Sequence, residues 1–260
     1  MSPAPGIHTL FESPGNEATP CVLIHGVGSD LGSWNAIAGQ LTLYAPVVRQ
    51  DLRGHGRSHS PAGTWDIDDF AADQLEVMDH LGIKAAHVIG FSLGGLIAQR
   101  LAARHPERVR SLVTISAVAG RTPQQRAAVL DRLDRIENDG PEAVAKESVE
   151  RWYSAEYLHA HPEVRDRTLA RMAALDPDSY ARAYRVLATT DLAAELGTIT
   201  AATLAMTGEL DIGSPPEMTR RIAESVRTGR HVVFPGVRHS ILSEIPDLIT
   251  KEILDHVRDC

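Results

Sequence analysis

The stretch that decides the fold is residues 86–105, which read AHVIGFSLGGLIAQRLAARH. The segment AHVIGF is apolar on both faces, as in a buried parallel strand, and LGGLIAQRLAARH carries apolar residues at helical spacing. Between them lies the pattern GFSLG, residues 90–94, on the turn from strand to helix. A serine on such a turn has a strained backbone and an exposed hydroxyl, and the flanking glycines leave room for the neighbouring strand and helix. We therefore predict Ser92 as a nucleophile, the alternative being a bystander serine in a glycine-rich turn.

The same alternation of short apolar strands and helices recurs on both sides of this stretch. We expect strands at residues 20–26, 46–49, 86–91, 111–116, 203–207 and 230–234, with a first, poorly defined strand somewhere in residues 7–12. Helical spacing of apolar residues predicts helices at residues 34–43, 67–81, 93–105 and about 246–257. Strands alternating with helices predict an α/β fold with a doubly wound, mostly parallel sheet.

The alternation breaks between about residues 121 and 190, where the pattern is helical and rich in arginine and glutamate. Because strands precede and follow this block, it reads as an insertion rather than a separate tail. We expect a core of residues 1–120 and 191–260 and a helical cap of residues 121–190. Such a cap would lie over the carboxyl ends of the strands, where open α/β sheets bind ligands.

Composition narrows the classes of partner. The net charge of −8 argues against nucleic acid, because phosphate binding needs a basic face. No apolar run approaches the roughly 20 residues of a membrane span, and the opening residues lack a signal-peptide pattern. The two cysteines, Cys21 and Cys260, suggest neither a disulfide framework nor a zinc site. We expect a cytoplasmic protein acting on a small molecule, and the choice between monomer and homo-oligomer stays open.

A serine hydroxyl needs a base within hydrogen-bond reach, and in a strand-turn-helix arrangement of this kind an acid and then a histidine should follow the serine along the chain. Asp211 follows the predicted strand TLAMT, and His239 follows the predicted strand RHVVF. We predict Asp211 as the orienting acid and His239 as the base. Glu209, nearer the strand end, is a rival acid, whereas His231 lies at the start of its strand and is a poor rival base.

Acyl transfer also needs two backbone N–H donors for the oxyanion. We expect one from Leu93, which follows the nucleophile, and one from Val27 in the turn HGVG at residues 25–28. His25 reads as a structural hydrogen-bonding residue rather than a second base. The segment DLRGHGRS, residues 51–58, has a single histidine and no clustered ligands, so a structural loop is favoured over a metal or phosphate site.

Taken in order, HGVG, DLRGHGRS, GFSLGG, TGELD and the late histidine resemble the α/β-hydrolase fold superfamily across nearly the whole chain. Within it, SDLGSWNAIAGQL, GFSLGGLIAQRLAARHPERVRSLV and RWYSAEYLHAHPE resemble bacterial 3-oxoadipate enol-lactonases. The resemblance implies a carboxylic ester or lactone hydrolase of aromatic catabolism that needs no metal or organic cofactor. Its substrate would be a small lactone with a carboxylate, neutralised by the arginine-rich cap. Trp34, Arg151 and Trp152 are the substrate-binding residues expected on this basis.

Other reactions use the same machinery. Cleavage of a C–C bond in a ring-fission diketone, hydrolysis of a small amide or enamide, and a cofactor-free perhydrolase or haloperoxidase activity all stay open, because the pocket and not the fold selects the reaction. A ligand receptor that retains the triad without catalysis is the alternative from a different class.

Overall fold

The computed structural model describes residues 6–260, so the first five residues of the expected core lie outside it. Within the described chain, a seven-stranded sheet has the order β1-β3-β2-β4-β5-β6-β7. The strands are β1 (Thr9–Glu12), β2 (Cys21–Ile24), β3 (Val47–Gln50), β4 (Ala86–Phe91), β5 (Val109–Ile115), β6 (Ala202–Gly208) and β7 (Gly229–Phe234). Each lies within two residues of its expected position. Only the β1–β3 pair is antiparallel.

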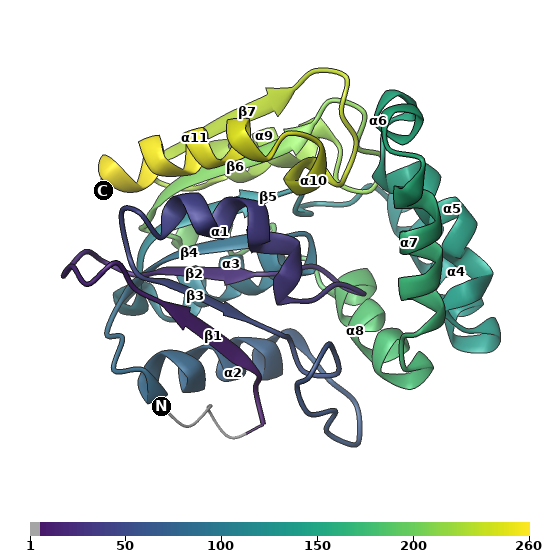
Figure 1. The fold of residues 1–260 in the computed structure, drawn as a ribbon, viewed down its shortest axis with the longest axis horizontal. Coiled ribbons are helices and arrows are strands. Elements are labelled where there is room, and N and C mark those ends of the chain that lie inside the picture. The colour runs from purple at the N-terminus through teal and green to yellow at the C-terminus, as the bar shows by residue number, and fades with distance from the viewer. Residues whose placement is uncertain (1–5) are drawn as a thin grey trace.

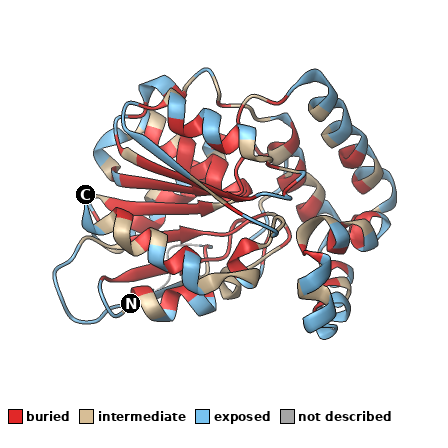
Figure 2. Ribbon diagram, turned by 90° about the horizontal axis from the view of Figure 1, so that it is seen from above, coloured by how far each residue is buried: buried red, intermediate tan, exposed pale blue. Residues whose placement is uncertain are grey.

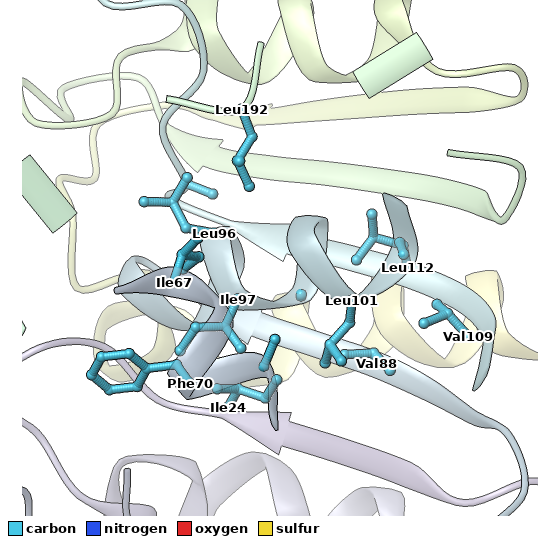
Figure 3. Packing of buried hydrophobic residues seen from close by; sticks show 14 of the residues in the cluster. Ile24, Ile67, Phe70, Val88, Leu96, Ile97, Leu101, Val109, Leu112 and Leu192 are labelled. Atoms are coloured by element: carbon cyan, nitrogen blue, oxygen red, sulfur yellow. The ribbon is translucent and has the colours of Figure 1, made fainter. Parts of the chain in front are cut away.

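Helices cover both faces of this sheet (Figure 1). The elements α1 (Asn35–Leu41) and α11 (Pro246–Arg258) pack together and bury one apolar cluster with the strands. On the other face, α2 (Ile67–His80), α3 (Leu93–Arg104) and α9 (Pro216–Ser225) contribute to a larger cluster. Figure 3 shows its centre, where Leu96, Ile97 and Leu101 of α3 lie among side chains of the strands and α2. The expected doubly wound sheet is confirmed.

Two helical details differ from the expectation. Residues 34–43 do not form one helix: a short 3₁₀ turn (Leu31–Trp34) precedes α1, and the Asp30 carboxylate caps this turn by accepting the Gly32 N–H at 2.7 Å. Helix α9 was not expected. Its buried apolar side chains are few, and its start depends on a proline in the first turn, a position proline favours.

Between β5 and β6 the chain forms five successive α-helices. They are α4 (Pro123–Asp139), α5 (Ala145–Trp152), α6 (Ala155–Ala160), α7 (Glu163–Ala173) and α8 (Pro177–Thr189). They stand beyond one end of the sheet (Figure 1) and bury two small apolar clusters of their own, while much of their outer surface is exposed (Figure 2). In residues 6–260, no helix is both long and apolar enough to cross a membrane.

The parallel strands place the chemistry-bearing segments at one edge of the sheet. Parallel strands β2, β4, β6 and β7 have their carboxyl ends along the same edge. The turn HGVG follows β2, Ser92 follows β4, the segment with Asp211 follows β6 and the loop with His239 follows β7. The last short helix, α10 (Ile241–Glu244), begins directly after that loop.

Candidate active site

Ser92 has the strained backbone that its sequence context predicts. Its φ is 55° and its ψ is −114°, and its N–H donates to Ile115 O on the adjacent strand at 2.8 Å. The flanking glycines are sterically required: a Cβ at Gly90 would lie 2.0 Å from Gly94 O, and a Cβ at Gly94 would lie 2.1 Å from Ile24 O. Positive φ in a residue other than glycine costs about 1–3 kcal/mol. The turn therefore holds Ser92 at the end of β4 at some cost in stability.

Asp211 and His239 form a hydrogen-bonded pair. The His239 Nδ1–H donates to Asp211 Oδ2 at 2.7 Å, and the N–H groups of Gly213 and Ser214 each donate to Oδ1 at 2.9 Å. Burial opposes ionisation of the Asp211 carboxyl, but the His239 ring and these hydrogen bonds outweigh it and hold the pKa of the carboxyl below its ordinary value. Asp211 is thus a buried carboxylate that fixes the orientation and tautomer of the His239 ring.

The rival acid and the rival base lie elsewhere. The Glu209 carboxylate is exposed and accepts the Gly236 N–H at 3.0 Å, so it is turned to the neighbouring loop rather than to His239. His231 is exposed on β7.

The turn after β2 lies directly against Ser92. A Cβ on Gly26 would be 3.0 Å from Ser92 Cβ. In the described part of the chain, neither Val27 N–H nor Leu93 N–H has a hydrogen-bond acceptor. Leu93 is the first residue of α3, where N–H groups have no partner within the helix. The two donors expected for an oxyanion are therefore unoccupied and belong to segments that flank Ser92.

Two buried histidines hold the peptides on either side of Val27. Leu52 N–H donates to His25 Nε2 at 2.9 Å, so the ring proton is on Nδ1 and is donated to Gly26 O at 2.7 Å. That oxygen belongs to the same peptide as Val27 N–H. Gly28 N–H donates to His55 Nε2 at 3.0 Å, and His55 Nδ1–H donates to Arg53 O at 2.9 Å.

Burial keeps both of these imidazoles neutral. Burial lowers the pKa of His25 to about 3, with a smaller contribution from the adjacent His55 ring. Burial likewise lowers the pKa of His55. A neutral imidazole has one donor and one acceptor, and each ring uses both. His25 is thus a hydrogen-bonding residue of the turn, as its position at the strand end indicates. The role of His55 was not anticipated.

The segment 51–58 is a hydrogen-bonded loop in this structure. The Asp51 carboxylate accepts Leu31 N–H at 2.8 Å and Arg57 N–H at 2.9 Å, and it contacts His8 Nδ1 at 2.8 Å. Gly56 has a φ of 51°, and a Cβ there would lie 2.3 Å from this carboxylate. The loop thus uses its carboxylate internally, and it supports His55 beneath the turn at Val27.

A cavity of about 210 Å³ brings these groups together. Ser92, Asp211, His239 and Val27 line it from the sheet side. The inserted helices and the segment leading into them contribute polar and aromatic side chains: Arg121, Arg132, Arg151, Trp152, Tyr184 and Arg171. Arg151 and Trp152 line this cavity, and their contact with substrate stays a prediction. Arg121, Arg132 and Arg171 were missed, because nothing in an arginine-rich helical block marks the arginines that face inward.

The expectation for Trp34 is wrong. Its side chain is completely buried in the apolar cluster beneath α1 and does not line the cavity, whereas the preceding Ser33 does. Trp34 is the last residue of the 3₁₀ turn Leu31–Trp34, and its indole packs in the core. Packing the large aromatic surface in the apolar core is more favourable than exposing it in a polar pocket.

The comparison with protein families agrees with this geometry. The pattern described as alpha/beta hydrolase fold matches residues 19–246. The chain belongs to the α/β hydrolase fold family. The fold, the family and the hydrolase class predicted from the sequence are thereby confirmed.

Several relatives of this α/β hydrolase are similar over most of its length. It is 26% identical over 237 residues to (E)-2-((N-methylformamido)methylene)succinate hydrolase of Acinetobacter baylyi, covering 90% of this chain and 89% of that one. It is 27% identical over 190 residues to 3-oxoadipate enol-lactonase 2 of the same organism, covering 73% and 70%. The crystal structure of the enol-lactonase from Burkholderia xenovorans LB400 matches with a TM-score of 0.90 at 28% identity, covering 97% and 96%.

Proposed function

We propose that this α/β hydrolase cleaves a small carboxylic ester or lactone by two-step acyl transfer. Ser92 is the nucleophile, His239 the general base and Asp211 the acid that orients it. The observation that carries the proposal is that a strained serine and a hydrogen-bonded pair, the buried Asp211 and the half-buried His239, line one cavity. Helices α4–α8, within residues 121–190, act as the cap over this cavity.

In the first step, Ser92 Oγ attacks the carbonyl carbon while His239 Nε2 takes the hydroxyl proton. Asp211 accepts the Nδ1–H and stabilises the imidazolium that forms. Val27 N–H and Leu93 N–H donate to the oxyanion of the tetrahedral intermediate. The C–O bond of the ester or lactone then breaks, and His239 returns the proton to the leaving oxygen. A water molecule, deprotonated by His239, hydrolyses the acyl-enzyme in the same way.

The substrate we propose is an enol-lactone of the 3-oxoadipate type. The cavity is small, and four arginine side chains line it, which suits a compact lactone with a carboxylate. Two of the named relatives, 3-oxoadipate enol-lactonase 2 and the enol-lactonase of Burkholderia xenovorans, support this choice. Such a substrate would place the enzyme in the cytoplasm with other enzymes of aromatic catabolism.

Enamide hydrolysis is the second candidate. The relative named (E)-2-((N-methylformamido)methylene)succinate hydrolase covers 90% of this chain and acts, by its name, on an unsaturated amide with a succinate skeleton. The same Ser–His–Asp chemistry cleaves either bond, and the same arginines would serve either anion.

The test combines active-site labelling with a substrate panel. A fluorophosphonate probe should form an adduct at Ser92 in the wild-type protein and none in Ser92→Ala. The panel contains a carboxylated enol-lactone, an uncharged aryl ester, a ring-fission diketone and a carboxylated enamide. We expect the enol-lactone to give the highest kcat/KM. Absence of an adduct at Ser92 would overturn the mechanism, and tenfold faster turnover of the enamide or the diketone would reassign the substrate.

A further inference from the structure

The four arginines that line the cavity differ in how far their charge is already neutralised. Within residues 6–260, Glu147 forms ion pairs with Arg132 and Arg151, and Asp191 lies near the charge of Arg121. Glu147 lies 2.8 Å from Arg132, 2.9 Å from Arg135 and 3.7 Å from Arg151. One carboxylate is therefore shared among three guanidinium groups, two of which face the cavity.

Two of the cavity arginines are also fixed by neutral acceptors. Arg132 donates to Ser148 Oγ at 2.5 Å and to Val144 O at 3.5 Å. Arg121 donates to a set of carbonyl oxygens in the segment that closes the insertion, those of Leu187, Ala188 and Thr190. Asp191 accepts the backbone N–H of Arg121 and lies near its charge. The N–H donors of Arg132 and Arg121 are thus used in hydrogen bonds within residues 121–190.

Arg171 lacks such partners. Among the described residues it has no hydrogen-bond acceptor and no ion-pair partner, and its Nε is buried without one. Its guanidinium carbon lies 6.0 Å from the centroid of the Trp152 ring, which also lines the cavity. A cation at this distance from an indole ring is attracted to its face, so the ring holds the guanidinium in place without using any of its N–H donors.

Arg171 lies near enough to His25, in the turn that flanks Ser92, for its charge to act on that ring. Burial and the neighbouring His55 lower the pKa of His25 to about 3, and the positive charge of Arg171 contributes to this lowering. His25 orients the peptide of Val27. Tyr180, which is 1% exposed, packs against Gly28 of the same turn, and its hydroxyl also has no partner in the described chain. Two polar groups without partners, the Arg171 guanidinium on α7 and the Tyr180 hydroxyl on α8, thus lie on the side of the cavity near the turn that flanks Ser92.

We propose that Arg171 is the residue that binds the carboxylate of the substrate and so selects anionic esters and lactones over neutral ones. A guanidinium offers a carboxylate two parallel N–H donors, and those of Arg171 are free, whereas Arg132 and Arg121 have committed theirs. Arg151 also makes no hydrogen bond, but Glu147 lies 3.7 Å away and partly neutralises its charge, whereas Arg171 has neither a hydrogen bond nor an ion pair in the described chain. This inference rests on the proposed ester or lactone hydrolysis at Ser92, and it adds which side chain sets the charge preference.

The experiment compares two esters of equal acyl length, mono-para-nitrophenyl succinate and para-nitrophenyl butyrate, which differ in a terminal carboxylate. The readout is the ratio of their kcat/KM values in the wild type, Arg171→Gln, Arg171→Lys and Arg135→Gln. Hydrogen bonds to a charged group are worth about 10- to 100-fold, so Arg171→Gln should lower the ratio by about that factor, mainly through KM for the succinate ester. Arg171→Lys keeps the charge but loses the paired donors, so its ratio should lie between those of the wild type and Arg171→Gln.

Arg135→Gln is the matched control. It removes one positive charge from the same helical block, and Arg135 pairs with the same Glu147 but does not line the cavity. Its ratio should stay within threefold of the wild type. Equal losses in Arg135→Gln and Arg171→Gln would show that only long-range charge matters and would overturn the proposal. An unchanged ratio in Arg171→Gln that still melts at the wild-type temperature would do the same.

A second readout separates this proposal from the proposed function. Free succinate should inhibit butyrate-ester hydrolysis competitively, with an inhibition constant at least tenfold higher in Arg171→Gln. If the wild type labels at Ser92 and hydrolyses both esters equally, the charge preference fails while the acyl-transfer mechanism stands. If it neither labels nor turns over either ester, the proposed function itself fails.

Discussion

His55 offers a test of how the oxyanion turn is held. Replacing His55 with leucine removes the acceptor for Gly28 N–H and the donor for Arg53 O. Both backbone groups are buried, and a buried polar group without a partner costs about 1–3 kcal/mol. We therefore expect His55→Leu to lower the free energy of unfolding by about 2–6 kcal/mol, a large part of the roughly 5–15 kcal/mol that a typical domain has.

The effect on catalysis should come through Val27. The peptide that follows Val27 loses its anchor at Gly28, while His25 still holds the peptide before it. Complete loss of one oxyanion donor costs about 10²–10³ in kcat, so a donor that is tilted rather than lost should cost less. We expect kcat for an ester substrate to fall about 10- to 100-fold, with a smaller change in KM.

The assay pairs urea unfolding, followed by tryptophan fluorescence, with steady-state kinetics at a temperature where the variant is fully folded. His87→Leu is the control, since His87 is also a buried histidine, bonded to Ser111 Oγ at 2.7 Å near the start of β4, the end remote from Ser92. It should lose about 1 kcal/mol of stability and keep its kcat. A folded His55→Leu with wild-type kcat would refute the argument that this histidine aims the Val27 peptide.

Three further perturbations test the rest of the site. Asp211→Asn should lower kcat by about 10⁴ because the tautomer of the base is no longer fixed, whereas Glu209→Gln should change kcat less than threefold; steady-state kinetics decides, and the reverse order would move the acid to Glu209. Ser92→Gly should abolish turnover and raise the free energy of unfolding by about 1 kcal/mol, since glycine adopts a φ of 55° without strain, and an unchanged urea midpoint would contradict that strain. The folded-state pKa values of His25, about 3, and of His55 lie below the 6.5 of an unperturbed histidine. As pH falls below 6.5 the unfolded chain therefore binds protons that the folded chain does not, so stability should drop by up to about 1.4 kcal/mol per pH unit from His25, and His55 should add to the drop in the same direction. Urea midpoints at pH 7, 6 and 5 would reveal or exclude this drop.

The sequence by itself determined the strands of the sheet, most of the helices that cover it, and the segments that reach the site. Those features follow from local rules: an apolar strand that runs into GFSLG must place Ser92 on a tight turn, and the residues that follow parallel strands must meet at one edge. Asp211 and His239 were predictable for the same reason, because each follows a strand.

Tertiary structure alone decided which of several chemically equivalent side chains face the cavity. Asp211 and Glu209 share one turn, and only the hydrogen bonds from Gly213 and Ser214, against the one from Gly236, direct the first to His239 and the second away. Nothing local indicates that His55 lies beneath the turn at Val27, because that contact joins two loops far apart in the chain.

The sequence could not show which arginines of helices α4–α8 face the cavity. A polar helix face can be turned to water or to a polar cavity at similar free energy, so hydrophobic periodicity cannot distinguish Arg171, which faces the cavity, from Arg135, which does not. Packing of the apolar faces, together with the sharing of Glu147, sets the rotation of these helices and leaves the donors of Arg171 free.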